Sequence, residues 1–401
     1  MFFCRLADIV LLIIVISVLT LWRFNEHAQS LSYVHKLRVL NQSISSLEVK
    51  MASTVSLIRN NTLRTHLRYP LVKKIPVVQP SIHTSLTTSS SKPAKQRKAL
   101  IFTMDSLTSF EQESLRGGAA GEMTIRRSLE EALTELEVKV DTVRSDAEFN
   151  ARSLIDYDIV ILDPWTWAGP GWVLKRNLIG VPLHRIYVLD FFGHPNRREM
   201  EGKVDVPYKN FLTAFGSPWK NTFLGYFLPE SILSVSAPRK LNQGVIWGKD
   251  HKHLTSHLSL ISHLADKVHL IATTTPLLDH PQITWLGHVD KQKWWNLLLE
   301  SKFLIGLGDP LLGPSAIDAI SAGCTFINPI YKQLKLGGYP SQNSFAQNIS
   351  PDRVCSYPLG DASKALECVN IALGRSFDVF IPPELSREAY IKRVRDIFGL
   401  D

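Results

Sequence analysis

The sequence predicts an α/β protein with two successive doubly wound halves. Apolar strand patterns alternate with helical patterns from Lys98 onward, and the alternation starts again at Gly244. Strands that alternate with helices are typical of parallel sheets, because each parallel connection needs a crossover. Two such series predict two sheets, and ligands are expected in the crevice at the carboxyl ends of their strands.

Short apolar runs bounded by polar residues or glycine mark the individual elements. In the first half, residues 98–235, strands are expected at 98–104, 138–143, 158–164 and 184–190, with a helix from Glu122 to about Leu136. In the second half, residues 236–401, strands are expected at 244–249, 268–273, 283–289, 303–306 and 324–328, with helices at 291–301 and 315–322.

The residues before this body predict a membrane anchor and a stem. Ile9 to Trp22 carries no charge, and counted from Phe2 the segment approaches the ~20 residues of a membrane span. A cleaved signal peptide is the alternative, but no small-residue cleavage site follows. We therefore expect residues 1–24 to form a cytoplasmic tail and signal anchor and residues 25–97 a stem.

The stem has two parts. Heptad spacing of apolar residues between Leu37 and Ile58 predicts either a short coiled coil, which would make a homodimer, or a lone amphipathic helix. Residues 76–98 are rich in Ser, Thr, Pro and Lys, which is the composition of a linker.

Charge and cysteine usage exclude several classes of protein. The net charge of +8 is partly due to the basic linker, and no basic run with interleaved aromatic residues is present, so nucleic acid is not expected as a partner. The four cysteines do not form a paired zinc pattern. Cys355 and Cys368 either form a disulfide in an oxidising compartment or remain thiols. Sequons at Asn41, Asn60 and Asn348 are candidates for glycosylation.

A glycine-rich loop precedes the first long helix, and Glu122 stands at its start. Gly117, Gly118 and Gly121 allow the backbone to approach a ligand closely, so a carboxylate here would face the crevice between the halves. The alternative is that Glu122 only complements the partial positive charge of the helix N-terminus.

A second glycine-rich turn, residues 306–315, leads from a strand into a helix. Its amides, with Gly306, Gly308, Gly313, Pro314 and Ser315 as the key residues, are suited to cradle a diphosphate. Asp318, one turn into the helix, can accept hydrogen bonds from ribose hydroxyls, and Lys249 can neutralise a phosphate. An ordinary turn with a solvated Asp318 and a surface Lys249 is the alternative.

Three stretches of the sequence resemble the N-acetylglucosaminyltransferase V family, the alpha-1,6-mannosylglycoprotein 6-beta-N-acetylglucosaminyltransferases. They are 217–226, Trp247-Gly248-Lys249, and 306–329, and the likeness extends over roughly residues 98–398. The resemblance implies a GT-B fold, UDP-GlcNAc as the donor, an N-glycan mannose as the acceptor, inversion at the anomeric carbon and no metal cofactor.

The resemblance also implies roles for single residues. The family's catalytic glutamate follows a Gly-Gly-x-x-Gly motif, which matches Gly117 to Glu122, and this identifies Glu122 as the general base. Asp190, in a segment similar to the family's acceptor side, is implied to bind the glycan, with a strand-end cap as its alternative. Anchor, stem and body together imply a single-pass type II protein of the Golgi membrane with a lumenal body.

The chain departs from the family's pattern in two places. Leu312 stands where the family carries a glutamate, and residues 195–208 lack a tryptophan-bearing acceptor segment. Two alternatives follow from these departures. The chain either uses the same donor with another acceptor, such as an O-linked mannose, or is a catalytically weak glycan-binding or scaffold protein of the Golgi.

Overall fold

The structure is a computed structural model, and one compact unit, Ser91–Asp401, contains all the residues that it describes. The described residues are 96–103, 106, 121–164, 180–193, 206–234, 240–248, 250–336 and 338–400. The expected anchor, the stem up to residue 95, Asn41, Asn60 and Lys249 lie outside them. No helix among the described residues is long and apolar enough to cross a bilayer.

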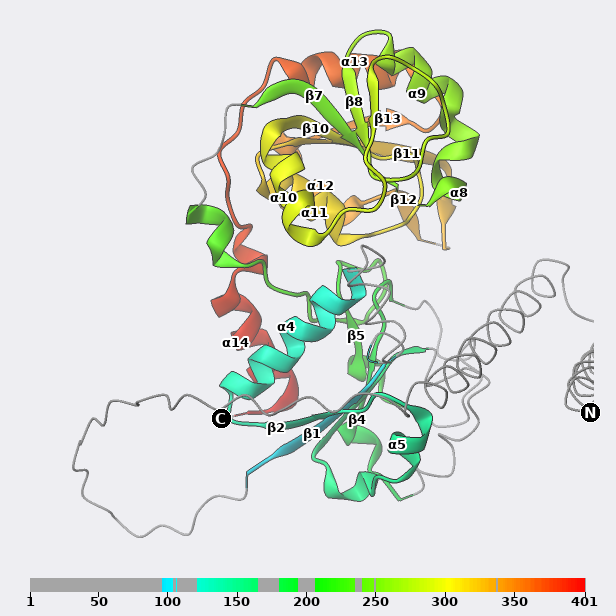
Figure 1. Ribbon diagram of the computed structural model, residues 1–401. Coiled ribbons are helices and arrows are strands. Elements are labelled where there is room, and N and C mark those ends of the chain that lie inside the picture. Colours follow the sequence, from blue (N-terminus) through cyan, green and yellow to red (C-terminus); the bar gives the residue numbers. More distant parts are fainter. Residues whose placement is uncertain are drawn as a thin grey trace, which may run out of the picture. The chain divides into compact units, whose positions relative to one another are not determined.

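The first half is built on a six-stranded parallel sheet with the order β2-β1-β3-β4-β5-β6 (Figure 1). Its elements are β1 (Lys98–Phe102), α4 (Gly121–Glu135), β2 (Lys139–Thr142), α5 (Asp146–Asn150), β3 (Ile159–Leu162), β4 (Ile186–Leu189), β5 (Phe211–Thr213) and β6 (Thr222–Phe223). Every residue of β3 is buried, as expected for a strand covered on both faces.

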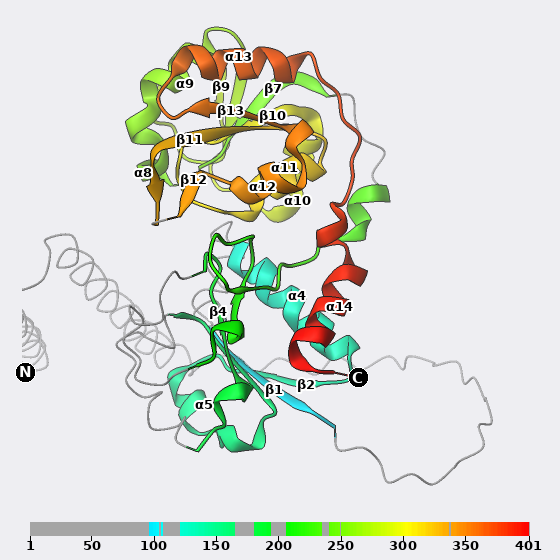
Figure 2. The same ribbon diagram turned by 180° about the vertical axis from the view of Figure 1, so that it is seen from behind.

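The second half contains a seven-stranded sheet in which all pairs are parallel except β11 with β12. Its strands are β7 (Leu241–Ile246), β8 (His269–Ala272), β9 (Ile283–Trp285), β10 (Ser301–Ile305), β11 (Thr325–Lys335), β12 (Tyr339–Ser341) and β13 (Val354–Pro358). Its helices are α8 (His251–Leu254), α9 (Leu258–Ala265), α10 (Lys291–Glu300), α11 (Pro314–Ser321), α12 (Ser344–Ile349) and α13 (Ala362–Leu373). Figures 1 and 2 show α9 and α13 on one face of this sheet and α10, α11 and α12 on the other.

Strand order places a switch point in each sheet. The parallel strands of the second sheet follow the order β9-β8-β7-β10-β11-β13, which reverses direction between β7 and β10. In the first sheet the order reverses between β1 and β3. Ligands of doubly wound proteins bind outside the carboxyl ends of the strands at such points.

All strands and helices expected for the two halves are present. The last helix of the range expected for the second half, residues 236–401, is α14 (Arg387–Phe398). This helix packs on α4 of the first half, where Arg387 Nη2 binds Glu135 Oε2 at 2.6 Å and Arg393 Nε donates to the Leu224 carbonyl at 2.9 Å. One continuous core cluster includes Ile125, Tyr226 and Phe345, so the halves share buried apolar contacts.

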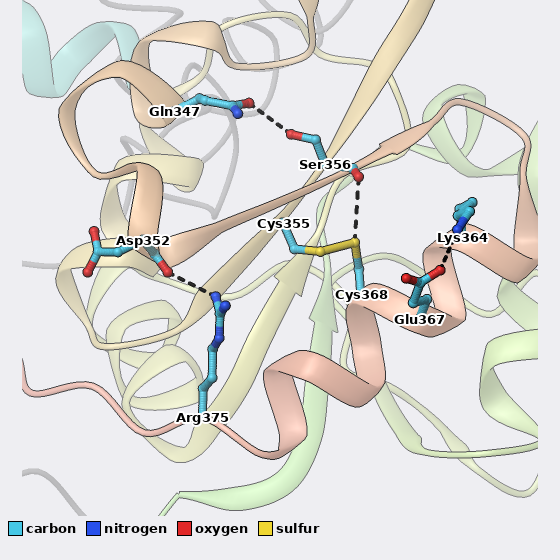
Figure 3. Close-up of a disulfide and its surroundings, with 8 residues drawn as sticks. All are labelled: Gln347, Asp352, Cys355, Ser356, Lys364, Glu367, Cys368 and Arg375. Carbon is cyan, nitrogen blue, oxygen red and sulfur yellow. Dashed lines mark hydrogen bonds and ion pairs between the residues drawn. A yellow bond between two sulfur atoms is a disulfide. The ribbon is translucent and has the colours of Figure 1, made fainter.

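A disulfide joins Cys355 on β13 to Cys368 on α13 (Figure 3), and Cys324 is a buried thiol. Strand β13 pairs only with β11 in the described sheet, so the bond fastens an outer strand to the helix that covers it. Asn348 lies exposed on α12, where a glycan would meet solvent.

The short covalent loop gives the first prediction. Replacing both cysteines (Cys355→Ala with Cys368→Ala) should lower the free energy of unfolding by about 2–4 kcal/mol, because the cross-link restricts the unfolded chain. Urea denaturation with and without reductant would measure this. Reductant should destabilise the parent protein and leave the double variant unchanged; equal midpoints under all four conditions would contradict the prediction.

Candidate active site

A pocket of about 520 Å³ lies at the carboxyl ends of the strands of both sheets. Its wall includes the start of α4 after β1, the turn after β4, the end of β7 and the loop after β10. It therefore lies at the switch points of both halves, where the strand order predicts a ligand. The residues that line the pocket are Gly121–Ile125, Arg127, Phe191, Phe192, Phe215, Trp247, Gly248, His253, Thr273, Val289–Lys291, Trp294, Pro310–Ser315 and Asp318.

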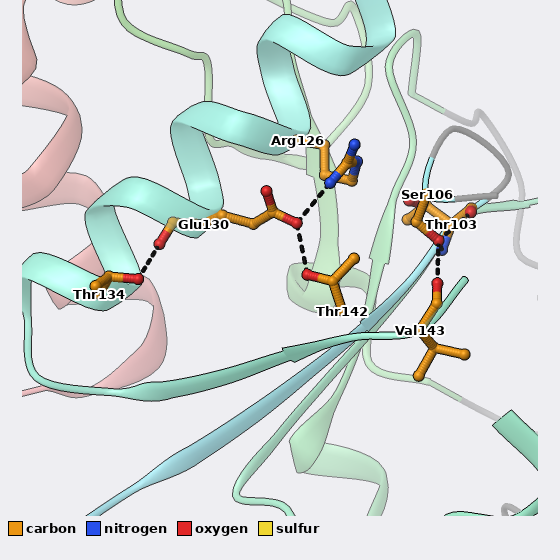
Figure 4. A network of polar contacts seen from close by, with 7 residues as sticks. All are labelled: Thr103, Ser106, Arg126, Glu130, Thr134, Thr142 and Val143. Carbon is orange, nitrogen blue, oxygen red and sulfur yellow. Dashed lines mark hydrogen bonds and ion pairs between the residues drawn. The ribbon is translucent and has the colours of Figure 1, made fainter. Parts of the chain in front are cut away.

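Glu122 lines this pocket from the first turn of α4. The helix is held to the edge of the first sheet about two turns later. There Glu130 Oε1 accepts from Arg126 Nη1 and from Thr142 Oγ1 on β2, each at 2.6 Å (Figure 4). Arg126 is buried, and a buried cation that is paired in this way resists displacement. The network fixes the direction of α4 and so the position of Glu122.

The N-termini of α4 and α11 meet at Gly121. A Cβ built on Gly121 would lie 3.0 Å from Pro314 Cδ, so a larger residue would press against the proline ring, which would have to shift by a few tenths of an ångström. Glu122, the next residue of the first half, lines the same pocket as the glycine turn 313–315 of the second half. This contact joins the two groups of residues that the sequence singled out.

The glycines of the turn 306–315 divide into two groups. Gly313, Pro314 and Ser315 line the pocket, whereas Gly306 and Gly308 lie behind it. The Gly306 amide donates to the Ile327 carbonyl and the Gly308 amide to Gln342 Oε1, both at 2.9 Å. Both amides are therefore used in hydrogen bonds within the protein and not for a ligand. The absence of side chains at 306 and 308 makes room for Gln342 and Leu359.

Gln342 and Asn343, which the sequence analysis did not single out, hold the turn from behind. Gln342 Nε2 donates to the Pro310 carbonyl at 2.9 Å and its own carbonyl accepts from the Leu312 amide at 2.9 Å. Asn343 Nδ2 donates to the Gly313 carbonyl at 3.1 Å. Both side chains are fully buried, so the shape of the turn is fixed before any ligand enters.

Asp318 is buried, so the alternative of a solvated side chain is wrong. Its Oδ2 accepts from Lys291 Nζ at 2.6 Å and from Trp294 Nε1 at 3.0 Å. Its Oδ1 has no hydrogen-bond partner among the described residues. An acceptor at the pocket wall that lacks a donor is suited to a ligand hydroxyl, because a buried acceptor without a partner is costly.

Asp190 does not line the pocket, although Phe191 and Phe192 after it do. Asp190 Oδ1 accepts from the Phe192 amide at 3.2 Å, which is the contact of a strand-end cap. Tyr339 of the second half donates its hydroxyl to the Phe192 carbonyl. Burial, helped by the charge of Asp190, raises the pKa of Tyr339 to about 12, so the hydroxyl keeps the proton that it donates at neutral pH.

The remaining wall is aromatic. The aromatic side chains come from the ends of the three strands β4, β5 and β7 and from α10, and they are Phe191, Phe192, Phe215, Trp247 and Trp294. Only the fold brings them together, so no local pattern in the sequence could identify them as one surface. Flat rings of this kind suit the apolar faces of sugars or a nucleobase.

Leu312, for which the resemblance implied a departure from the family's pattern, is buried at the pocket wall with φ at +49°. It brings only apolar surface to a position where a carboxylate would bring charge. No cluster of three metal-ligating side chains occurs within the part of the chain that the structure describes.

Comparison with known proteins connects this chain to one family. The family model described as glycosyltransferase family 18 matches residues 187–398, more than half of the chain. The alpha-1,6-mannosylglycoprotein 6-beta-N-acetylglucosaminyltransferase A of Homo sapiens is 25% identical over 255 residues, covering 56% of this chain and 34% of that protein. The protein of the same name from Mus musculus is 24% identical over 255 residues, with the same coverage of 56% and 34%. The chain spans about a third of the length of these relatives.

Solved structures include similar but distant folds. A glycosyltransferase involved in avilamycin A biosynthesis aligns with a TM-score of 0.47 and 11% identity, covering 76% of this chain and 98% of its own. UDP-GlcNAc 2-epimerase from Methanocaldococcus jannaschii aligns with a TM-score of 0.44 and 9% identity, covering 76% of this chain and 100% of its own. The match over residues 187–398 is the stronger finding, and it shows that the chain belongs to glycosyltransferase family 18.

Proposed function

We propose that the protein is an inverting GT-B glycosyltransferase that moves N-acetylglucosamine from UDP-GlcNAc to the 6-hydroxyl of the alpha-1,6-arm mannose of an N-glycan. One observation carries the proposal. Glu122 from one half and the turn 313–315 with Asp318 from the other half line the same pocket. A base and a site for a sugar nucleotide are the two parts that such a transfer needs.

The reaction is a single displacement. The Glu122 carboxylate takes the proton of the mannose hydroxyl while the hydroxyl oxygen attacks the anomeric carbon of the donor. The bond from that carbon to the β-phosphate oxygen breaks, and its electron pair leaves with UDP. Attack from the face opposite to UDP inverts the configuration.

Negative charge grows on UDP as it departs. We propose that protein groups, and not a bound metal, stabilise this charge. The N-terminus of α11 lines the pocket through Gly313, Pro314 and Ser315, and that of α10 through Lys291. Helix N-termini carry partial positive charge and amides that lack intrahelical acceptors, so the N-terminus of α11 favours a diphosphate. The N-terminus of α10 is already capped by Asp290, whose carboxylate accepts from the Lys293 amide at 2.7 Å, so its contribution is the Lys291 ammonium. Asp318 Oδ1 is the acceptor that we assign to a ribose hydroxyl.

The names of the relatives support the choice of donor and linkage, since they are N-acetylglucosaminyltransferases that act on a mannosylglycoprotein. We place the protein in the Golgi membrane with a lumenal body. The disulfide fits an oxidising compartment, and the exposed sequon at Asn348 fits exposure to the glycosylation machinery.

The function is tested by incubating the full-length chain with labelled UDP-GlcNAc and a panel of acceptors. The panel contains a biantennary N-glycan and an O-mannosyl glycan, followed by linkage analysis of the product. A β-1,6-linked product on the N-glycan supports the proposal, and transfer to the O-mannosyl glycan alone moves the acceptor to that class. Calorimetric absence of UDP and UDP-GlcNAc binding would instead indicate a scaffold protein.

Removing the proposed base gives the second prediction. Glu122→Gln should keep UDP affinity nearly unchanged and reduce kcat by about a hundredfold or more, because the amide cannot accept the proton. Glu131→Gln is the matched control: it lies on the same helix, is exposed, and is absent from the pocket wall. Parent-like turnover of Glu122→Gln would remove this residue from the mechanism.

The third prediction concerns metal removal. Treatment with EDTA followed by desalting should leave the transfer rate within about twofold of the untreated protein, because helix N-termini and side-chain cations are assigned the task of a Lewis acid. A rate that falls with EDTA and returns with manganese would disprove the metal-independent mechanism.

A further inference from the structure

Lys291 occupies an unusual position for a lysine. It is the first residue of α10, where the helix N-terminus disfavours a cation by a few tenths of a kcal/mol or more. Its side chain is 41% exposed and lines the pocket. An unfavourable placement of charge at a pocket wall requires a compensating interaction.

Asp318 supplies part of that compensation. The Lys291 ammonium lies 2.6 Å from Asp318 Oδ2, and the Trp294 indole binds the same oxygen at 3.0 Å. Because Asp318 is buried and cannot turn outward, the pair fixes the ammonium one turn from the N-terminus of α11. An ammonium has three protons, and Asp318 Oδ2 uses one of them in the contacts described here.

One buried polar atom in the pocket wall remains without a hydrogen bond among the described residues. This atom is Oδ1 of Asp318, a residue that is buried at the pocket wall. A ligand that brings both a hydroxyl and an anion would satisfy the carboxylate oxygen and the ammonium together.

We propose that Lys291 is a donor-binding cation that contacts the diphosphate of the nucleotide sugar, and that Asp318 positions it. This inference rests on the proposed function and adds a residue to it. The amides of Gly313 and Ser315 and the Lys291 ammonium all come from the second half, at the starts of α11 and α10, and these residues line the same pocket. They act together on the oxygen that leaves with UDP.

The fourth prediction separates phosphate binding from a structural role. Lys291→Met should weaken UDP binding by about tenfold to a hundredfold, the usual range for losing a hydrogen bond to a charged group. Affinity for uridine, which has no phosphate, should change by less than about threefold. Calorimetry for UDP and ligand-observed NMR for uridine provide both numbers from the same preparation, so the fraction of folded protein cancels in their ratio.

Two further variants complete the experiment. Lys293→Met removes the same charge from the same helix, but Lys293 is exposed and absent from the pocket wall, so UDP affinity should remain within about twofold. Lys291→Arg keeps the cation and should recover most of the lost affinity.

Equal loss of UDP and uridine affinity in Lys291→Met, or equal effects of Lys291→Met and Lys293→Met, would overturn the assignment of Lys291 while leaving the proposed transferase intact. Failure of the parent protein to bind UDP would overturn the transferase as well.

Discussion

The close contact between Gly121 and Pro314 is the constraint on which the site depends. Helix α4 of the first half and helix α11 of the second half both begin at this point. Glycine allows the close approach, because a Cβ at position 121 would lie 3.0 Å from the ring of Pro314. The carboxylate that follows Gly121 therefore lies beside the turn that opens α11. Each half contributes one part of the pocket, and neither half contains the whole.

Buried contacts elsewhere maintain this alignment. Phe345 on α12 packs edge-on against Phe215 with ring centroids 6.0 Å apart, and Trp219 packs against Tyr339 at 5.6 Å. Tyr339 also bonds the turn at Phe192, so one side chain of the second half shapes a wall contributed by the first. Aromatic pairs are stable at such geometries, and these link the two sheets close to the pocket.

Much of this arrangement was predictable from the sequence. The buried strands are apolar runs, and the helices that begin at Gly121, Lys291 and Pro314 have clear start signals. Strand order then determines where ligands bind, so Glu122 and the turn 313–315 could be assigned to one crevice. Short strands such as β6, with two residues, contain too few positions for a periodic pattern and were missed.

The parts that could not be predicted depend on contacts between distant residues. Gln342 looks like any polar residue, and only the fold shows that it occupies the space left by Gly306 and binds the Gly308 amide. The partnership of Lys291 with Asp318 likewise joins two helices. The packing of α14 on α4 likewise joins segments that are far apart in the sequence.

That last packing has a consequence for biosynthesis. During translation the first sheet emerges from the ribosome long before residues 387–398, yet the apolar face of α4 needs Tyr390, Val394 and Phe398 to cover it. Until the second half has been synthesised, part of the apolar surface of the first half therefore remains exposed. The core of the first half is therefore completed only after the second half has been synthesised.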